Sequence, residues 1–227
     1  TRSIVLYLEG IARGRDLFEA IKASDKPVLV HKSGRTDAGA RMAFSHTAAL
    51  TGDDAVLSAM LAQAGAVRVE SSGEVANLCK AFELPPVRGP RVAIISRSGG
   101  HAVVAADCAA DSGFDLPPFS SDLLSMATGR QVIKRGNPLD LGDVFDIDLY
   151  GQLLGAAAAD PGFDAVVLMF GYFPPFETET GRRLVPLVRE LTERHGKPVV
   201  LALMSDEQEL VELRRLHPYP YFESVED

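Results

Sequence analysis

Short, continuous apolar segments alternate with helical patterns along almost the whole chain, and this alternation limits the possible folds more than any other feature. Uninterrupted apolar runs are typical of strands that are covered on both faces. The order strand, helix, strand, helix therefore predicts an α/β fold with helices on both faces of a parallel sheet. We expect strands at 3–9, 26–32, 66–71, 91–96, 163–170 and 197–204, and helices at 12–23, 53–64, 73–82, within 98–113, and at 147–160, 180–195 and 206–215.

The stretch ELPPVRGP at 83–90 interrupts this pattern with three prolines and a glycine. Such a composition is typical of a linker. We expect a first domain at 1–84, a linker at 85–90 and a second domain at 91–227. Each half contains an apolar strand, a glycine-bearing loop, a helix and a strand that begins Lys-Pro-Val. The sequence therefore predicts two flavodoxin-like parallel-sheet domains in tandem.

Composition argues against several classes of function. The net charge of −8, with no basic stripe to offset it, argues against a general nucleic-acid binder. No apolar run approaches the roughly 20 residues needed to cross a bilayer, so we expect a soluble protein and no membrane partner. Cys79 and Cys108 belong to no CxxC pair, and no metal-ligand spacing is present. They fit reduced thiols in a cytoplasmic protein, although pairing stays open, and we expect no metal site.

Ligands of parallel α/β sheets bind outside the carboxyl ends of the strands, and three such ends carry unusual residues. Glu9 follows the first strand, where a carboxylate is often a solvated loop residue or a helix cap, but can also fix the tautomer of an imidazole. Ser98, Gly99 and Gly100 would expose unpaired N–H groups at a helix start, which is an anion site in principle. The third is FGYFPPF at 170–176, which an apolar loop packed on a neighbouring domain would explain equally well.

His46 lies in a loop of small residues between Lys32 and Gly52. A lone histidine is usually a polar surface residue or a satisfied core residue. The neighbours of His46, however, lack the bulk to bury it. A neutral imidazole is a competent nucleophile towards phosphorus, and a phosphorylated one is stabilised by positive dipoles such as the helix start near Ser98. His46 is therefore the candidate phosphoryl acceptor.

The segment KPVLVHKSGRTDAGARMAFSHTAALTGDD, at 26–54, closely resembles the phosphohistidine segment of NDP-forming (ADP-forming) acyl-CoA synthetases, relatives of succinyl-CoA synthetase. The combination of Lys-Ser-Gly-Arg with Ser-His-Thr is its most specific part. Three further segments resemble the same family, so that the resemblance covers nearly the whole chain. These are YLEG at 7–10, SRSGGHAVVAADCAADSG at 96–113 and GNPLDLGD at 136–143.

The resemblance implies a reaction and roles for the candidate residues. In this family ATP phosphorylates the histidine, the phosphoryl group passes to a carboxylate, and coenzyme A attacks the resulting acyl phosphate. His46 would carry the phosphoryl group and Glu9 would orient and stabilise it. The backbone amides of Ser98, Gly99 and Gly100 would hold the phosphoryl group.

The resemblance also places the third strand end close to the carboxylic acid substrate, where relatives have a Gly-rich loop. Gly171, Tyr172 and Phe173 are therefore candidate substrate-binding residues, and the aromatic side chains suggest a larger or more apolar acid than succinate. Two positions depart from the family pattern. Ala48 replaces a glycine after Ser-His-Thr. His101 replaces a small residue or proline. Its side chain is a second phosphate contact, a competing phosphoryl acceptor, or a residue that only fills the helix surface.

The resemblance implies three parts that have no counterpart in these 227 residues. These are the family's coenzyme A-binding Rossmann domain, the opening βα unit of the first flavodoxin-like domain, and the ATP-grasp domain or subunit. We expect the Rossmann domain and the ATP-grasp domain or subunit as partners, and CoA and ATP with Mg²⁺ as substrates bound mainly by them, with no permanently bound cofactor. The isolated chain is then not expected to make acyl-CoA, and assembly as a homo- or hetero-oligomer stays open. One alternative is the small-molecule-sensing region of a protein lysine acetyltransferase, and another is a carbamoyl- or oxamate-related relative that uses the same fold for different chemistry. His46 and Glu9 favour the enzyme, because a sensor needs no phosphoryl acceptor.

Overall fold

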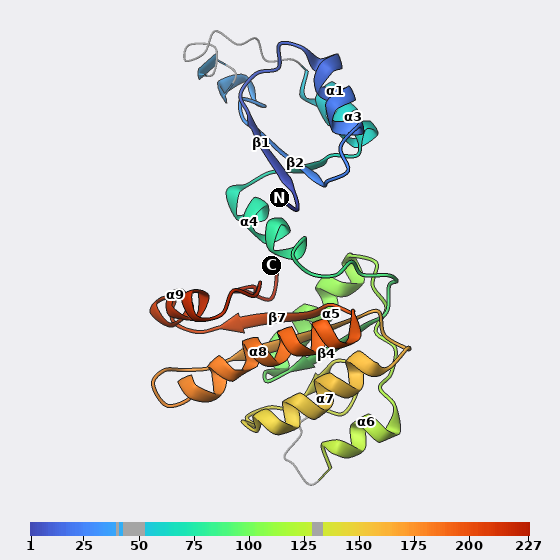
Figure 1. Ribbon diagram of the computed structural model, residues 1–227, viewed down its shortest axis with the longest axis vertical. Coiled ribbons are helices and arrows are strands. Elements are labelled where there is room, and N and C mark those ends of the chain that lie inside the picture. Colours follow the sequence, from blue (N-terminus) through green and yellow to red (C-terminus); the bar gives the residue numbers. More distant parts are fainter. Residues whose placement is uncertain (40, 43–52, 129–133) are drawn as a thin grey trace. The chain divides into compact units, whose positions relative to one another are not determined.

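The computed structural model describes residues 1–39, 41–42, 53–128 and 134–227, which form two compact units (Figure 1). The first unit is Thr1–Glu83 and the second is Leu84–Asp227. Each contains one parallel sheet with helices packed against it, as the alternation of apolar and helical segments predicts. None of the helices within the described ranges is long and apolar enough to cross a membrane.

The sheet of the first unit has the strand order β1-β2-β3, with all strands parallel. Two helices, α1 and α3, pack together on one face of it, and α4 contacts β2 and β3 (Figure 1). The core between the sheet and helices α1 and α3 contains Ile21, Val28, Val30 and Leu61. The elements are β1 (Ile4–Leu8), α1 (Gly14–Lys22), β2 (Val28–Lys32), α3 (Asp54–Ala64), β3 (Val67–Val69) and α4 (Ser72–Ala81).

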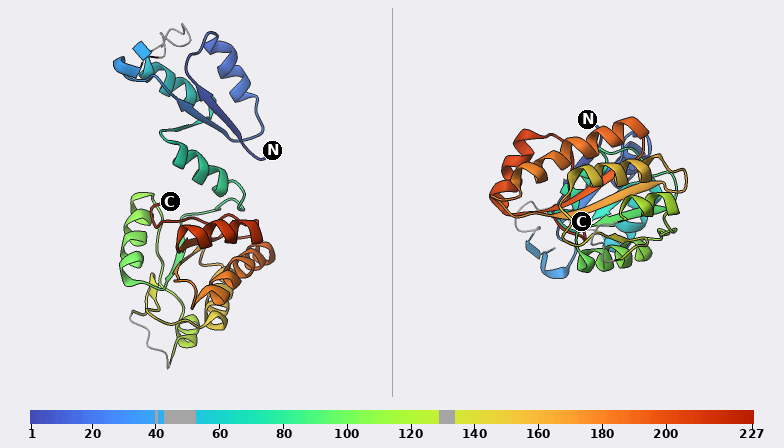
Figure 2. Two further views of the ribbon diagram at one scale, coloured as in Figure 1. Left: turned by 90° about the vertical axis from the view of Figure 1, so that its left-hand side faces the viewer. Right: turned by 90° about the horizontal axis from the view of Figure 1, so that it is seen from below.

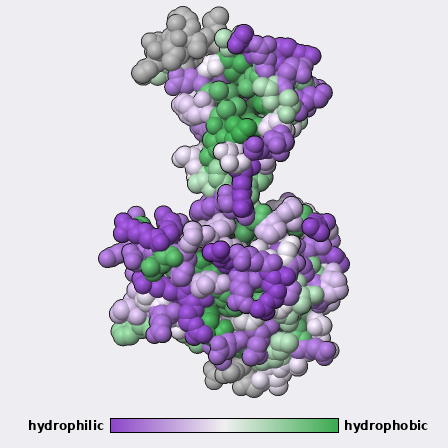
Figure 3. Space-filling view, in the orientation of Figure 1, coloured by the Kyte–Doolittle hydropathy of each residue, from purple (hydrophilic) through white to green (hydrophobic). Residues whose placement is uncertain are grey.

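The expectation that the first strand is covered on both faces is wrong. Ile4, Leu6 and Leu8 pack against the core, whereas the alternate side chains Val5 and Tyr7 are 44% and 61% exposed. Strand β1 is an edge of the described sheet, and both α1 and α3 pack on its other face. Figure 3 shows apolar surface, in green, on this unit.

Capping residues set the ends of α3, which begins directly after the segment that contains His46. The Asp53 side chain accepts hydrogen bonds from the backbone N–H groups of Ala55, at 2.8 Å, and Val56, at 3.3 Å. An aspartate at this position satisfies amides that have no partner within the helix. At the other end Gly65 adopts a left-handed conformation with φ of 84°, which glycine tolerates without steric cost.

The sheet of the second unit has the order β5-β4-β6-β7 and is also parallel. Helix α5 covers one face, and α6, α7, α8 and α9 build a larger core on the other (Figure 2). All five side chains of β4 are buried, as expected for a strand covered on both faces. The elements are β4 (Val92–Ser96), α5 (Gly99–Asp111), α6 (Ser121–Met126), β5 (Leu139–Asp140), α7 (Ile147–Ala159), β6 (Ala165–Gly171), α8 (Thr178–His195), β7 (Val199–Met204) and α9 (Glu207–Leu216).

Candidate functional site

The carboxyl edge of the first sheet carries charged residues at the ends of all three strands. Glu9 follows β1 directly and is half-buried. Lys32 is the last residue of β2, and Glu70 follows β3. Leu8 is the register partner of Lys32, so Glu9 and Lys32 lie at neighbouring strand ends. His46 lies outside the described residues.

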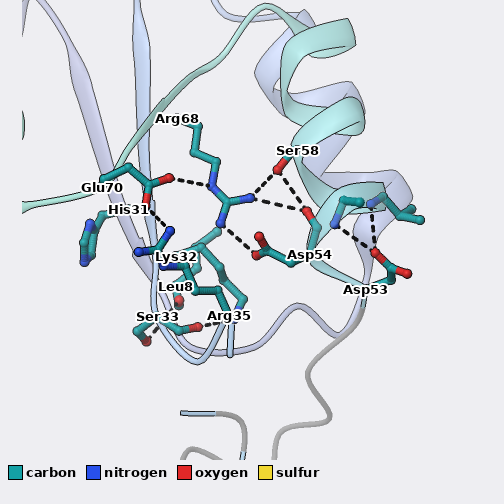
Figure 4. A network of polar contacts seen from close by, with 12 residues as sticks. Leu8, His31, Lys32, Ser33, Arg35, Asp53, Asp54, Ser58, Arg68 and Glu70 are labelled. Carbon is teal, nitrogen blue, oxygen red and sulfur yellow. Dashed lines mark hydrogen bonds and ion pairs between the residues drawn. The ribbon is translucent and has the colours of Figure 1, made fainter. Parts of the chain in front are cut away.

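Arg68, on β3, is the centre of a polar network at this edge (Figure 4). Its Nη2 donates to Asp54 Oδ1 at 2.7 Å, and its Nη1 donates to the Asp54 carbonyl oxygen at 3.3 Å and to the Ser58 hydroxyl. Its Nε lies 3.6 Å from Glu70, which also forms an ion pair with Arg35. Because the Arg68 side chain is largely buried, these charge-assisted contacts hold the first turn of α3 against β3.

Lys32 is buried beside this network, with only 7% of its surface exposed. Its ammonium donates to the carbonyl oxygen of Ser33. Burial lowers the pKa of Lys32, while the nearby carboxylates of Asp54 and Glu9 act in the opposite direction. Sequence reasoning gave this residue no role, although a lysine that ends a continuous apolar strand is a signal of a buried cation.

The predicted anion site in the second unit lies at the start of α5. The Ser96 hydroxyl donates to the carbonyl oxygen of Ser98 at 2.8 Å and accepts from the Ser98 N–H at 3.0 Å, which fixes the turn into the helix. Gly99 approaches the buried Asp140 of β5 closely, since a Cβ at position 99 would lie 2.8 Å from Asp140 Oδ2. A Cβ at Gly100 would meet only the Ser98 hydroxyl, at 3.9 Å.

The predicted substrate loop after β6 has one aromatic side chain inside the core and one outside. Tyr172 is fully buried and donates its hydroxyl hydrogen to Glu209 Oε1 at 2.7 Å. Burial and this hydrogen bond raise the pKa of Tyr172. Phe173, by contrast, is 76% exposed. In this structure Tyr172 therefore anchors the loop, and Phe173 is the residue of the pair that faces solvent.

Arg97, the residue after β4, binds the same loop through its side chain. Its Nη1 donates to the Gly171 carbonyl oxygen at 2.6 Å, and its two terminal nitrogens contact the Glu177 carboxylate at 3.0 and 2.7 Å. The guanidinium also lies over the Phe145 ring, 4.5 Å from its centroid. Bidentate pairing and stacking together demand an arginine, because lysine has neither the fork nor the plane.

Ser98, Gly99 and Gly100 form the start of α5, which follows β4, and Gly171 is the last residue of β6. Because β4 and β6 are paired parallel strands, these residues lie at neighbouring strand ends on the carboxyl edge of the second sheet. Glu9 belongs to the first unit. His101 follows in the first turn of α5, where its Nδ1 is buried and has no hydrogen-bond partner among the described residues.

Comparison with known proteins gives consistent relatives for both units. Residues 1–82 match the family described as succinyl-CoA ligase like flavodoxin domain. Over 174 residues, 74% of the chain, the sequence is 36% identical to acetate–CoA ligase [ADP-forming] II of Archaeoglobus fulgidus, of which it spans 26%. It is 32% identical over 209 residues to the alpha subunit of acetate–CoA ligase [ADP-forming] I of Pyrococcus furiosus, covering 90% of this chain and 45% of that protein.

A solved structure of the Ca. Korarchaeum cryptofilum dinucleotide forming acetyl-coenzyme A synthetase 1, in complex with phosphate and ADP, matches the whole chain with a TM-score of 0.82 and 25% identity. This chain covers 50% of that one. The prediction of an α/β fold with two flavodoxin-like parallel sheets is confirmed. The chain spans between about a quarter and a half of the length of these relatives.

Proposed function

Because the chain belongs to the family of ADP-forming acyl-CoA synthetases related to succinyl-CoA synthetase, we propose that it forms the phosphohistidine-bearing part of such an enzyme. The observation that carries the proposal is the similarity to ADP-forming ligases, which extends over 90% of the chain for one relative. The proposed overall reaction converts ATP, a carboxylic acid and coenzyme A to acyl-CoA, ADP and phosphate. Since these relatives are ligases, they favour catalysis over a purely sensory role.

His46 is the proposed phosphoryl carrier. A nitrogen of its neutral imidazole attacks the terminal phosphorus of ATP, a P–N bond forms, and ADP leaves. A carboxylate oxygen of the acid then attacks the same phosphorus, which yields an acyl phosphate and restores the imidazole. Finally the thiolate of coenzyme A attacks the acyl carbonyl and phosphate leaves. Coenzyme A and ATP would be bound mainly by a Rossmann domain and an ATP-grasp domain or subunit.

Glu9 and the start of α5 are proposed to assist the carrier. A carboxylate that accepts a hydrogen bond from one imidazole nitrogen leaves the other free to attack, and Glu9 stands at a strand end that suits this role. Amides at a helix N-terminus stabilise phosphoryl oxygens, which is the role of Ser98, Gly99 and Gly100. The exposed Phe173 supports an acid with an apolar portion.

Phosphorylation of the native protein tests the proposal, with any domains or subunits that co-purify. Incubation with γ-labelled ATP and Mg²⁺ should give an acid-labile, base-stable label, and addition of an accepted acid with coenzyme A should discharge it. The variant His46→Ala should remain unlabelled, whereas His195→Ala, at the end of α8, should label normally. Label that survives His46→Ala, or that is found on His101, would contradict the assignment.

A further inference from the structure

Lys32 is a buried cation that the proposed mechanism leaves without a role. Its one hydrogen bond within the described residues goes to a neutral group, the carbonyl oxygen of Ser33. No carboxylate in the described part of the chain forms an ion pair with it. An ammonium has three N–H donors, so further donors are available to another acceptor.

Lys32 lines a pocket of about 210 Å³ at the carboxyl edge of the first sheet. Its walls come from the end of β2, the start of α1 and the first two turns of α3. The charged residues that line it are Lys32, Asp53 and Asp54. This volume is large enough for a phosphate-sized group, and Lys32 is its only cationic side chain among the described residues.

The two carboxylates in the pocket wall have partners of their own. Asp54 is bound by Arg68 at 2.7 Å, and Asp53 accepts from the backbone N–H groups of Ala55 and Val56. Neither forms a hydrogen bond or a direct ion pair with Lys32 in the described part of the chain, although the nearby Asp54 partly offsets the effect of burial on the pKa of Lys32. A buried ammonium without a counter-ion is costly, and either gives up its proton or is compensated by an anion. Burial lowers the pKa of Lys32, and the nearby carboxylates of Asp54 and Glu9 do not fully offset this effect.

We propose that Lys32 is a positioning residue for the phosphoryl group, whose oxygens accept hydrogen bonds from its ammonium in this pocket. The inference rests on the proposed function, because that function supplies the phosphoryl group. Lys32 lies on the strand next to Glu9, because it is the register partner of Leu8, the residue before Glu9. In this arrangement Glu9 orients the imidazole, and Lys32 neutralises charge on the phosphoryl oxygens. A lysine suits this task because it is a compact point charge for phosphate.

Binding of inorganic phosphate to the 227-residue chain, measured by isothermal titration calorimetry, tests the inference. Loss of a hydrogen bond from a buried cation should weaken binding about 10- to 100-fold in Lys32→Gln. Lys32→Arg, which keeps the charge, should bind within a few-fold of the wild type. Lys26→Gln removes an exposed lysine that precedes the start of β2 and should leave phosphate binding unchanged. Thermal unfolding of each variant separates loss of binding from loss of fold. Normal phosphate binding by Lys32→Arg would also show that loss of fold does not explain the effect of Lys32→Gln.

The outcomes distinguish this inference from the proposed function. If the wild-type chain does not bind phosphate at millimolar concentration, or if Lys32→Gln binds as well as the wild type, Lys32 has no such role, even when His46 is labelled by ATP. Lys32-dependent phosphate binding in a protein whose His46 is never labelled would instead keep the anion site and remove the phosphohistidine mechanism. Equal loss of binding in Lys32→Gln and Lys32→Arg, with both variants folded, would also contradict the inference.

Discussion

Gly99 and Asp140 are in such close contact that no side chain fits between them. A Cβ added at Gly99 would lie 2.8 Å from Oδ2 of Asp140, which is buried on β5. The other carboxylate oxygen, Oδ1, accepts from the N–H of Gly142 at 2.9 Å and holds the carboxylate in place. The glycine therefore sets how closely the start of α5 approaches the neighbouring strand.

Gly99→Ala should destabilise the second unit by about 1–3 kcal/mol, because the new methyl group must displace a buried, hydrogen-bonded carboxylate. Gly100→Ala is a matched control on the next residue, where a Cβ meets only the Ser98 hydroxyl at 3.9 Å. That variant should be neutral or stabilising by up to about 1 kcal/mol, since alanine is the better helix former. Chemical denaturation followed by circular dichroism measures both. Equal stability of the two variants would show that Asp140 moves aside freely.

Tyr172→Phe should cost about 1–2 kcal/mol of stability, because it removes the hydrogen bond to the buried Glu209. The loss is limited, since Arg182 still contacts the same carboxylate at 2.8 and 2.7 Å. Tyr7→Phe is the control: this ring is 61% exposed and should tolerate the change within about 0.5 kcal/mol. Urea denaturation of the wild type and both variants measures these differences in the free energy of unfolding. A Tyr172→Phe variant as stable as the wild type would mean that the hydroxyl does not anchor the loop.

The fold could be predicted from the sequence wherever an element is long and its pattern is periodic. The apolar strand at 91–96 and the amphipathic helix at 180–195 correspond to β4 and α8. The two-residue strand β5 and the short helix α6 were missed, because such elements depend on tertiary contacts. The Asn137 side chain, for example, donates to the carbonyl oxygens of Val92 and Pro117 at 2.7 and 2.9 Å and accepts from Ile94 N–H at 3.0 Å.

For the candidate site, the sequence predicted which residues follow the carboxyl ends of the strands, but not how their side chains are arranged. Glu9 and Ser98 follow apolar strands, and the structure places both at carboxyl edges of parallel sheets. The direction of a side chain is a different matter. Nothing in FGYFPPF distinguishes the buried Tyr172 from the exposed Phe173, since that difference depends on Glu209, 37 residues later. The role of His46 stays a prediction.

Asp164 should make the acid stability of the second unit depend on its ion pair with Arg91. Arg91 donates from Nε and Nη2 at 2.9 Å each and from its backbone N–H at 3.0 Å. These bonds lower the pKa of Asp164 from 3.8 to about 2. A carboxyl with a lowered pKa in the folded protein binds its proton more readily when unfolded. Its contribution to stability is therefore full above about pH 4 and is lost as the pH falls through about 2.

Asp164→Asn should accordingly reduce stability at neutral pH and make the stability profile less steep between about pH 4 and pH 2. Asp148→Asn is the control, because Asp148 is 83% exposed and its contact with Arg183 is 3.6 Å long. Denaturant midpoints measured across this range for the wild type and both variants give the comparison. If the Asp164→Asn profile runs parallel to that of the wild type, protonation of Asp164 does not contribute to acid unfolding.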